Sequence, residues 1–213
     1  MTQPGLAKVV RAWATLAIPC LLLAGCADRD GNEASARNGT SGAVTASPRP
    51  ISTRLELTQQ SSELASKHAL VPVGTVSLLL TGRALGFGEY VWNDAAVPPG
   101  DLIIWIDLER QLGSVFRAGH EIGTSVILYG DEDHATPMGR LTIINKARDY
   151  RSRAYDAPMP YAMFVTTDGV AIHGSPMGSG RATHGCVGLP EEFARILFAQ
   201  ARVGDTVTIV RSS

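Results

Sequence analysis

The sequence has little charge, few aromatic side chains and few cysteines, and each shortage excludes a class of protein. Charged residues make up 18% of the 213 residues, and 19 basic against 20 acidic side chains leave a net charge of −1. No large basic field is therefore present to attract nucleic acid. Scattered aromatic residues, at 6%, give no base-stacking platform. Three cysteines, Cys20, Cys26 and Cys186, cannot build a disulfide framework.

Apolar residues, by contrast, are plentiful. They make up 45% of the sequence, which is enough to build a core and excludes a wholly disordered chain. The length fits one ordinary domain with some extra chain, or at most two small domains.

Residues 1–27 contain no acidic side chain. Lys8 and Arg11 precede an uncharged stretch, residues 12–24, which is shorter than the roughly 20 residues that a membrane-spanning helix needs. A basic start, a short apolar run and small residues at the end are typical of a secretory signal.

This segment ends in Leu23-Ala24-Gly25-Cys26, which resembles a bacterial lipobox. The resemblance implies a signal peptide over residues 1–26 and an acylated Cys26 as the first mature residue. A plain cleaved signal and a buried core helix are the alternatives, and Pro19 disfavours the helix. With Cys20 removed and Cys26 blocked by lipid, Cys186 would be the only free thiol of an exported protein. A lone free thiol is unusual in an exported protein, so we expect Cys186 to have a function.

Residues 27–50 have the composition of a flexible tether. They are mostly small and polar, with Val44 as the only large aliphatic side chain, so burial cannot offset the cost of ordering the backbone. As a flexible coil the segment spans roughly 27 Å. Such a tether suits a domain held just off a membrane.

Residues 51–99 are expected to form an N-terminal extension that packs on a main domain at residues 100–213. In the extension, Ser52 or Thr53 is expected to cap a helix reaching about Ala69, and residues 73–80 read as a strand. In the main domain, strands are predicted over 102–106, 112–116, 125–129, 140–144, 163–167, 170–172 and 205–210.

Local signals support these boundaries. Asp168-Gly169 is a two-residue hairpin signal. Pro190 begins the one convincing helix, Glu191 and Glu192 complement its dipole, and Gly204 marks its end. We therefore predict a mainly β, sandwich-like fold with one packed C-terminal helix.

The residues with distinctive chemistry lie between His173 and Cys186. A thiol is a nucleophile only as the thiolate, and a histidine on an adjacent strand end is the usual base for it. The amides of Gly185 and Cys186 are candidates for an oxyanion hole. Gly174 leaves a carbonyl accessible to orient the imidazole.

Two other readings stay open at this point. A free cysteine is commonly a small buried hydrophobic residue, although Cys186 sits in a polar loop. Alternatively, His173, His184 and Cys186 are candidate zinc ligands, although no fourth ligand at a suitable spacing is evident. His120 and His134 are too isolated to supply it.

His173-Gly174 followed by Thr183-His-Gly-Cys186 resembles the active-site signature of the L,D-transpeptidase (YkuD-type) catalytic domain family. Supporting segments follow the same order: Thr136-Pro-Met-Gly139, Met159-Pro-Tyr161-Ala-Met163, and the closing helix and strand after Pro190. The resemblance implies a β-sandwich-like fold, no metal or cofactor, and attack on the peptide stems of peptidoglycan.

In that scheme Cys186 is the nucleophile and His173 the base, oriented by the Gly174 carbonyl. His184 and Gly185 shape the oxyanion pocket. Tyr161, Thr183 and Arg181 contact the substrate.

The sequence also departs from the family pattern. Only nine residues separate His173 from Thr183, which implies a shortened lid. Gly188 stands two residues after the cysteine, where family members often have arginine or asparagine. Arg181 and Arg140 are candidates to replace that side chain.

Three functions fit the resemblance. A transpeptidase would form cross-links or attach proteins to the wall. A hydrolase on the same scaffold would act as a carboxypeptidase or amidase, and a non-catalytic module would only bind the wall. We expect a monomer, anchored to a membrane by lipid at Cys26. Because Ala27 rather than an acidic residue follows Cys26, the resemblance implies the periplasmic side of the outer membrane.

Overall fold

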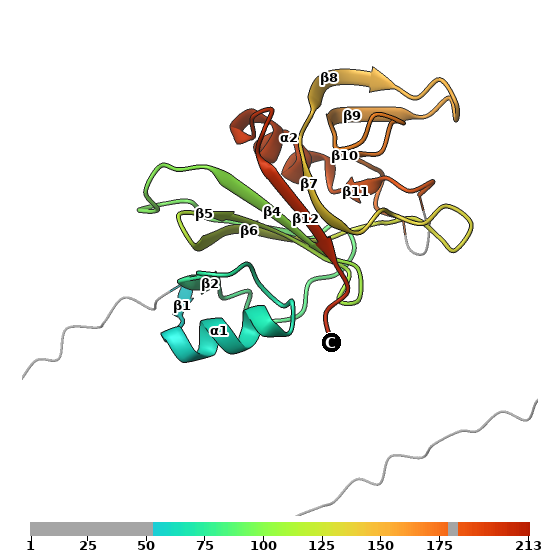
Figure 1. Cartoon of the computed structure of the whole chain (residues 1–213). Coiled ribbons are helices and arrows are strands. Elements are labelled where there is room, and N and C mark those ends of the chain that lie inside the picture. The colour runs from blue at the N-terminus through green and yellow to red at the C-terminus, as the bar shows by residue number, and fades with distance from the viewer. Residues whose placement is uncertain (1–52, 179–182) are drawn as a thin grey trace, which may run out of the picture. The chain divides into compact units, whose positions relative to one another are not determined.

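The computed structural model describes residues 53–178 and 183–213 (Figure 1). All of them belong to the second of two compact units of the chain, residues 49–213. The signal peptide predicted at 1–26, with Cys26, and the tether at 27–50 lie outside the described residues, as does Arg181.

The larger sheet has eight strands in the order β1-β2-β6-β5-β4-β12-β7, with β3 also paired to β6. Its centre is the antiparallel series β4-β5-β6, and β12 joins β4 in parallel. The strands are β1 (Arg54–Glu56), β2 (Ser77–Leu79), β3 (Tyr90–Trp92), β4 (Leu102–Asp107), β5 (Leu112–Arg117), β6 (His120–Val126), β7 (Gly139–Thr142) and β12 (Thr206–Val210).

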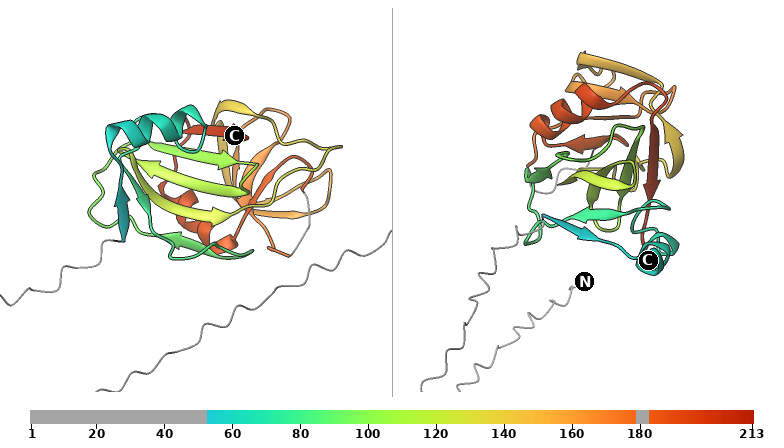
Figure 2. Two further views of the ribbon diagram at one scale, coloured as in Figure 1. Left: turned by 90° about the horizontal axis from the view of Figure 1, so that it is seen from below. Right: turned by 90° about the vertical axis from the view of Figure 1, so that its left-hand side faces the viewer.

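The smaller sheet has four strands in the order β11-β10-β9-β8. They are β8 (Asn145–Arg151), β9 (Pro158–Phe164), β10 (Ala171–Gly174) and β11 (Val187–Leu189), and helix α2 (Glu191–Gln200) follows β11 directly. Figures 1 and 2 show α2 and this sheet on one side of the larger sheet, and helix α1 (Gln59–Lys67) on the other.

The main core is formed jointly by both sheets and α2. Ile104 and Ile106 of β4, Ile172 of β10, and Phe193 and Leu197 of α2 are all buried in it. Along β12 the residues alternate between partly buried and buried, as the sequence pattern predicts. The predicted mainly β fold with a packed C-terminal helix is confirmed.

The N-terminal segment differs from the prediction. The helix expected from about Thr53 begins only at Gln59, where the Thr58 side chain accepts a hydrogen bond from the Ser61 amide. The preceding Arg54–Glu56 is instead strand β1, paired with β2. Pairing with β2 provides hydrogen-bond partners for the backbone N–H and C=O groups of these residues, which a longer helix would have satisfied within itself.

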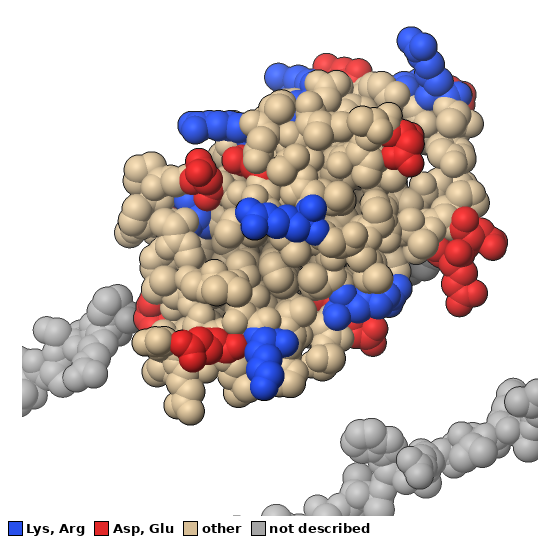
Figure 3. Space-filling model, in the orientation of Figure 1, with Lys and Arg blue, Asp and Glu red and all other residues tan. Residues whose placement is uncertain are grey.

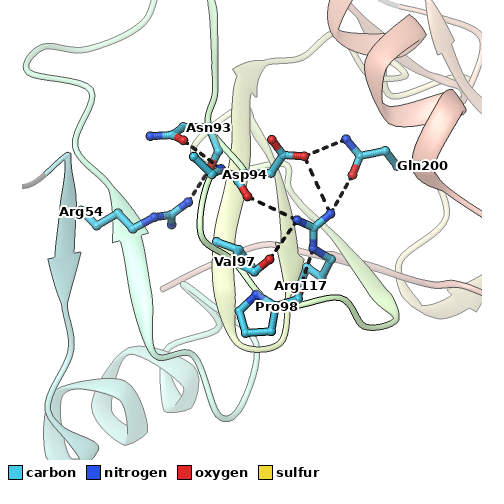
Figure 4. Close-up of polar contacts among 8 residues, drawn as sticks. Arg54, Asn93, Asp94, Val97, Pro98, Arg117 and Gln200 are labelled. Atoms are coloured by element: carbon cyan, nitrogen blue, oxygen red, sulfur yellow. Dashed lines mark hydrogen bonds and ion pairs between the residues drawn. The ribbon is translucent and has the colours of Figure 1, made fainter.

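A partly buried arginine ties α2 to the larger sheet (Figure 4). Arg117 of β5 donates to the Gln200 side chain at 3.0 Å and to the Pro98 carbonyl at 3.1 Å. The Gln200 amide donates to Asp94 at 3.1 Å. These bonds fix the C-terminal end of α2 against the larger sheet.

The charges on the face seen in Figure 3 are interspersed, and neither sign forms a large patch there. Within the described part of the chain, no helix is long and apolar enough to cross a membrane.

Candidate active site

A cleft of about 710 Å³ lies at one end of the smaller sheet. One wall is the β8–β9 connection, and the other parts come from the β9–β10 turn, the end of β10 and the segment leading into β11. His173, His184 and Cys186 all line this cleft, and so does Thr183.

The pairing of β10 with β11 brings His173 and Cys186 together. These strands are parallel, with Ile172 opposite Val187 and His173 opposite Gly188. Cys186 therefore lies beside Ala171, and side chains two residues apart on a strand share a face. The thiol and the imidazole consequently project from the same face of the sheet into one cleft.

The His173 side chain is held in one orientation. It is buried, with 7% exposure, and its Nδ1 lies 2.8 Å from the Gly174 carbonyl oxygen. A carbonyl only accepts, so Nδ1 carries the proton and Nε2 is left to exchange one. Burial lowers the pKa of His173 and the Gly174 bond opposes this, so the neutral imidazole, the form that acts as a base, is favoured.

Cys186 is the free cysteine of the described residues. Burial raises the pKa of its thiol, the Ala171 amide opposes the shift, and Asp168 adds to it. The sulfur lies 3.9 Å from the Gly169 carbonyl oxygen. The resting group is therefore a thiol, and a nucleophile forms only when a base removes its proton.

The turn before Cys186 is fixed by backbone contacts. The Thr183 hydroxyl donates to the Cys186 carbonyl, and the Thr183 amide donates to the Tyr129 carbonyl at 2.9 Å. Gly185 has φ +95°, and a Cβ on the neighbouring Gly130 would lie only 2.9 Å from its nitrogen. Two glycines are thus required for this close approach and for the conformation that presents Cys186.

His184 lies between two rings. Tyr155 stacks on it with centroids 4.0 Å apart and planes at 17°, and His134 meets it edge-on at 4.8 Å. His134 is held by Asp131, whose carboxylate accepts from its backbone amide at 2.9 Å. His134 is therefore close to His184 and not isolated as the sequence suggests, because the loop that follows Tyr129 folds back to the cleft.

Tyr161, predicted to contact the substrate, is not among the residues that line the cleft. Its ring packs against Phe198 of α2, with centroids 5.8 Å apart. Tyr161 has φ +57°, which interrupts the alternation of side chains along β9. Met159 and Ala162 consequently share the Cys186 side of the sheet, whereas Tyr161 and Met163 pack in the main core.

Of the two candidate cations for the cleft, Arg181 lies outside the described residues, and only Arg140 can be placed. Arg140 lies exposed on β7 beside Thr206 and does not line the cleft. Arg153 in the β8–β9 connection does line it, as does Tyr155. Neither residue was predicted, and no motif marks them, since they belong to a polar segment whose position depends on the hairpin.

No three His, Cys, Asp or Glu residues within 53–178 and 183–213 lie close enough together to hold a metal ion. The described residues therefore give the zinc reading of His173, His184 and Cys186 no support.

A cysteine and an oriented histidine in one cleft are an arrangement that fits the class of thiol-dependent acyltransferases and hydrolases. The family model of the L,D-transpeptidase catalytic domain (YkuD) matches residues 101–209. The chain belongs to this family.

Solved structures of similar fold include L,D-transpeptidases from three bacteria. The Stackebrandtia nassauensis protein is 24% identical with a TM-score of 0.49, over 53% of this chain and 56% of that one. L,D-transpeptidase 3 from Mycobacterium tuberculosis, in complex with a faropenem-derived adduct, is 20% identical with a TM-score of 0.49, over 52% and 60%. The Enterococcus faecium protein is 24% identical with a TM-score of 0.46, over 53% and 50%.

The chain thus spans between half and three fifths of the length of these structures. At these scores the likenesses add nothing to the family assignment, which rests on the family model. No curated protein matches the chain.

Proposed function

We propose that this protein is a peptidoglycan L,D-transpeptidase that works through an acyl-enzyme on Cys186. The observation that carries the proposal is the parallel register of β10 and β11, which puts Cys186 and His173 on one face and in one cleft. The Nδ1 bond to Gly174 leaves the other ring nitrogen of His173 available for proton transfer.

The first half of the reaction forms a thioester. His173 Nε2 takes the proton from the Cys186 thiol as the sulfur attacks a carbonyl carbon of the donor stem. The amides of Gly185 and Cys186 stabilise the resulting oxyanion. The bond to the leaving amine breaks, the proton on His173 passes to that amine, and the terminal amino acid departs.

The second half of the reaction transfers the acyl group. An acceptor amine attacks the thioester and loses its proton to His173, and collapse of the intermediate returns the proton to the sulfur. If water takes the place of the amine, the same steps give hydrolysis. The choice between transfer and hydrolysis therefore depends on which nucleophile enters the cleft.

Two further parts of the proposal concern location. We propose that Cys26 is lipidated and that residues 27–50 tether the catalytic domain close to the wall. The lipobox-like ending of the N-terminal segment supports the anchor, and Ala27 supports the outer membrane. We further propose that the protein is exported and acts as a monomer.

The test is mass analysis of purified muropeptides incubated with protein lacking residues 1–26. New dimers are expected with the wild type and none with Cys186→Ala. Trimmed monomers without dimers would show that the protein is a hydrolase and not a transferase. Unchanged muropeptides with every acceptor supplied would contradict catalysis and favour a wall-binding module.

A further inference from the structure

We propose that Ser175 is a positioning residue for His173, and that position 188 is glycine because the Ser175 hydroxyl occupies the space where a side chain would stand. This inference rests on the proposed function, in which His173 is the base.

Ser175 follows His173 by two residues and lines the same cleft. Its hydroxyl oxygen lies 3.3 Å from His173 Nδ1, while the Gly174 carbonyl lies 2.8 Å from the same nitrogen. The Nδ1–H group therefore has a strong acceptor and a weaker second one. The Ser175 backbone is fixed in turn, because its amide donates to the Leu189 carbonyl at 2.8 Å.

Gly188 lies opposite His173 in the β10–β11 pair. A Cβ at this position would lie 2.8 Å from the Ser175 Oγ, 3.0 Å from the Ser175 Cβ and 3.2 Å from the Leu128 Cβ. Contacts this close force a neighbour to move.

The backbone around Gly188 leaves little room for such a movement. Gly188 and Leu128 exchange two hydrogen bonds, of 2.9 Å and 2.8 Å, and β11 is paired with β10. The Ser175 hydroxyl is the part that turns most readily. A side chain at 188 would therefore displace the hydroxyl from His173.

The contact affects the proton transfer in two ways. A second acceptor at Nδ1 strengthens the preference for the tautomer with a free Nε2. It also stabilises the imidazolium that exists while His173 holds the thiol proton, at a buried place where water cannot do so. Without the hydroxyl His173 is a weaker base.

The test measures the rate of Cys186 acylation by faropenem from pH 5 to pH 9 in wild type, Ser175→Ala, Gly188→Ala and the double variant. Ser175→Ala should slow acylation at pH 7 about five-fold, the usual effect of one hydrogen bond, and shift the midpoint of the acid limb to lower pH. Gly188→Ala should do the same.

The double variant should be no slower than the slower single variant, because Ser175→Ala removes the closest contact of the new methyl group. Gly100→Ala is the matched control. It lies outside the cleft, the nearest atom to an added Cβ is 3.8 Å away, and the variant should leave the rate and the pH profile unchanged.

Thermal melting identifies any variant that fails to fold. If Ser175→Ala does not fold, the acylation rate and pH profile of Gly188→Ala provide the test instead. The inference is overturned if wild type is acylated at Cys186 while folded Ser175→Ala and Gly188→Ala keep its rate and its acid limb. Failure of the wild type itself to form an adduct would instead count against the proposed function.

Discussion

The imidazole of His184 and the phenol ring of Tyr155 are stacked, with centroids 4.0 Å apart and planes at 17°. His184 is two residues from Cys186, whereas Tyr155 belongs to the connection between β8 and β9. The contact therefore fixes the wall of the cleft against the segment that carries Cys186.

Tyr155→Ala should raise the KM for stem-peptide donors by roughly 2- to 12-fold, the range expected for loss of one aromatic pair. Acylation by faropenem, a smaller molecule, should change less. Steady-state kinetics on a tetrapeptide stem measure this, with Tyr155→Phe as the matched control that keeps the stacked ring. A KM raised equally by Tyr155→Phe would show that the hydroxyl, not the stack, is responsible.

The two histidines of the cleft should differ in their effects. His173→Ala should slow acylation by about 10²- to 10⁴-fold, as loss of a general base does. His184→Ala should be milder, because its ring contacts Tyr155 and His134 and it shapes the pocket. Single-turnover acylation rates compare the two variants, and an equal or larger loss at His184 would reverse the assigned roles.

The pH dependence should show a neutral resting pair. Burial raises the pKa of Cys186, so alkylation by iodoacetamide, which needs the thiolate, should rise only at a pH above about 8.5. Burial lowers the pKa of His173, so the neutral base persists to lower pH. Acylation by faropenem should therefore decline only below about pH 6.5.

Rates of both reactions across the pH range provide the check. Rapid alkylation that stays constant down to pH 6 would mean a preformed thiolate–imidazolium pair, contrary to the pKa directions given by burial.

The anchor is tested by fractionation. Wild type should partition with membranes, and with the outer membrane in a Gram-negative host, whereas Cys26→Ser should not, since stable anchoring needs more than one acyl chain and the variant would carry none. Replacing Cys20 should change nothing, because it lies in the segment that we propose is removed as a signal peptide. Membrane-bound Cys26→Ser with unaltered mass would point instead to an uncleaved N-terminal anchor.

The sequence predicts that His173 and Cys186 lie together because a short motif determines their positions. His173 ends one strand and Cys186 precedes the next, and a parallel pair brings the two positions together. Strands β4 and β5 are equally well predicted, since apolar runs such as 102–106 and the Asp168-Gly169 turn are local signals. The strand expected at 125–129 is instead β6, His120–Val126. Gly169 indeed has φ +106°, the conformation that a glycine permits.

Strand β8 could not be predicted from local sequence signals. It is the edge strand of the smaller sheet and is mostly exposed, so charged side chains stand where a buried strand would have apolar ones. Without β8 the hairpin that carries Arg153 and Tyr155 cannot be placed. The contact between His134 and His184 likewise depends on a loop far away in the sequence.

Tyr161 is a different case. The segment that carries it was identified, and the alternation expected for a strand would place Tyr161 beside Met159. The left-handed backbone at Tyr161 shifts that alternation. Residue propensities do not predict this shift, because non-glycine residues seldom adopt a left-handed conformation.

The intact mass of the protein after reaction with faropenem tests the central claim most directly. Wild type lacking residues 1–26 should gain one covalent adduct per chain, mapped by peptide analysis to Cys186, and Cys186→Ala should gain none. One adduct per chain on folded Cys186→Ala would contradict the assignment of Cys186 as the nucleophile.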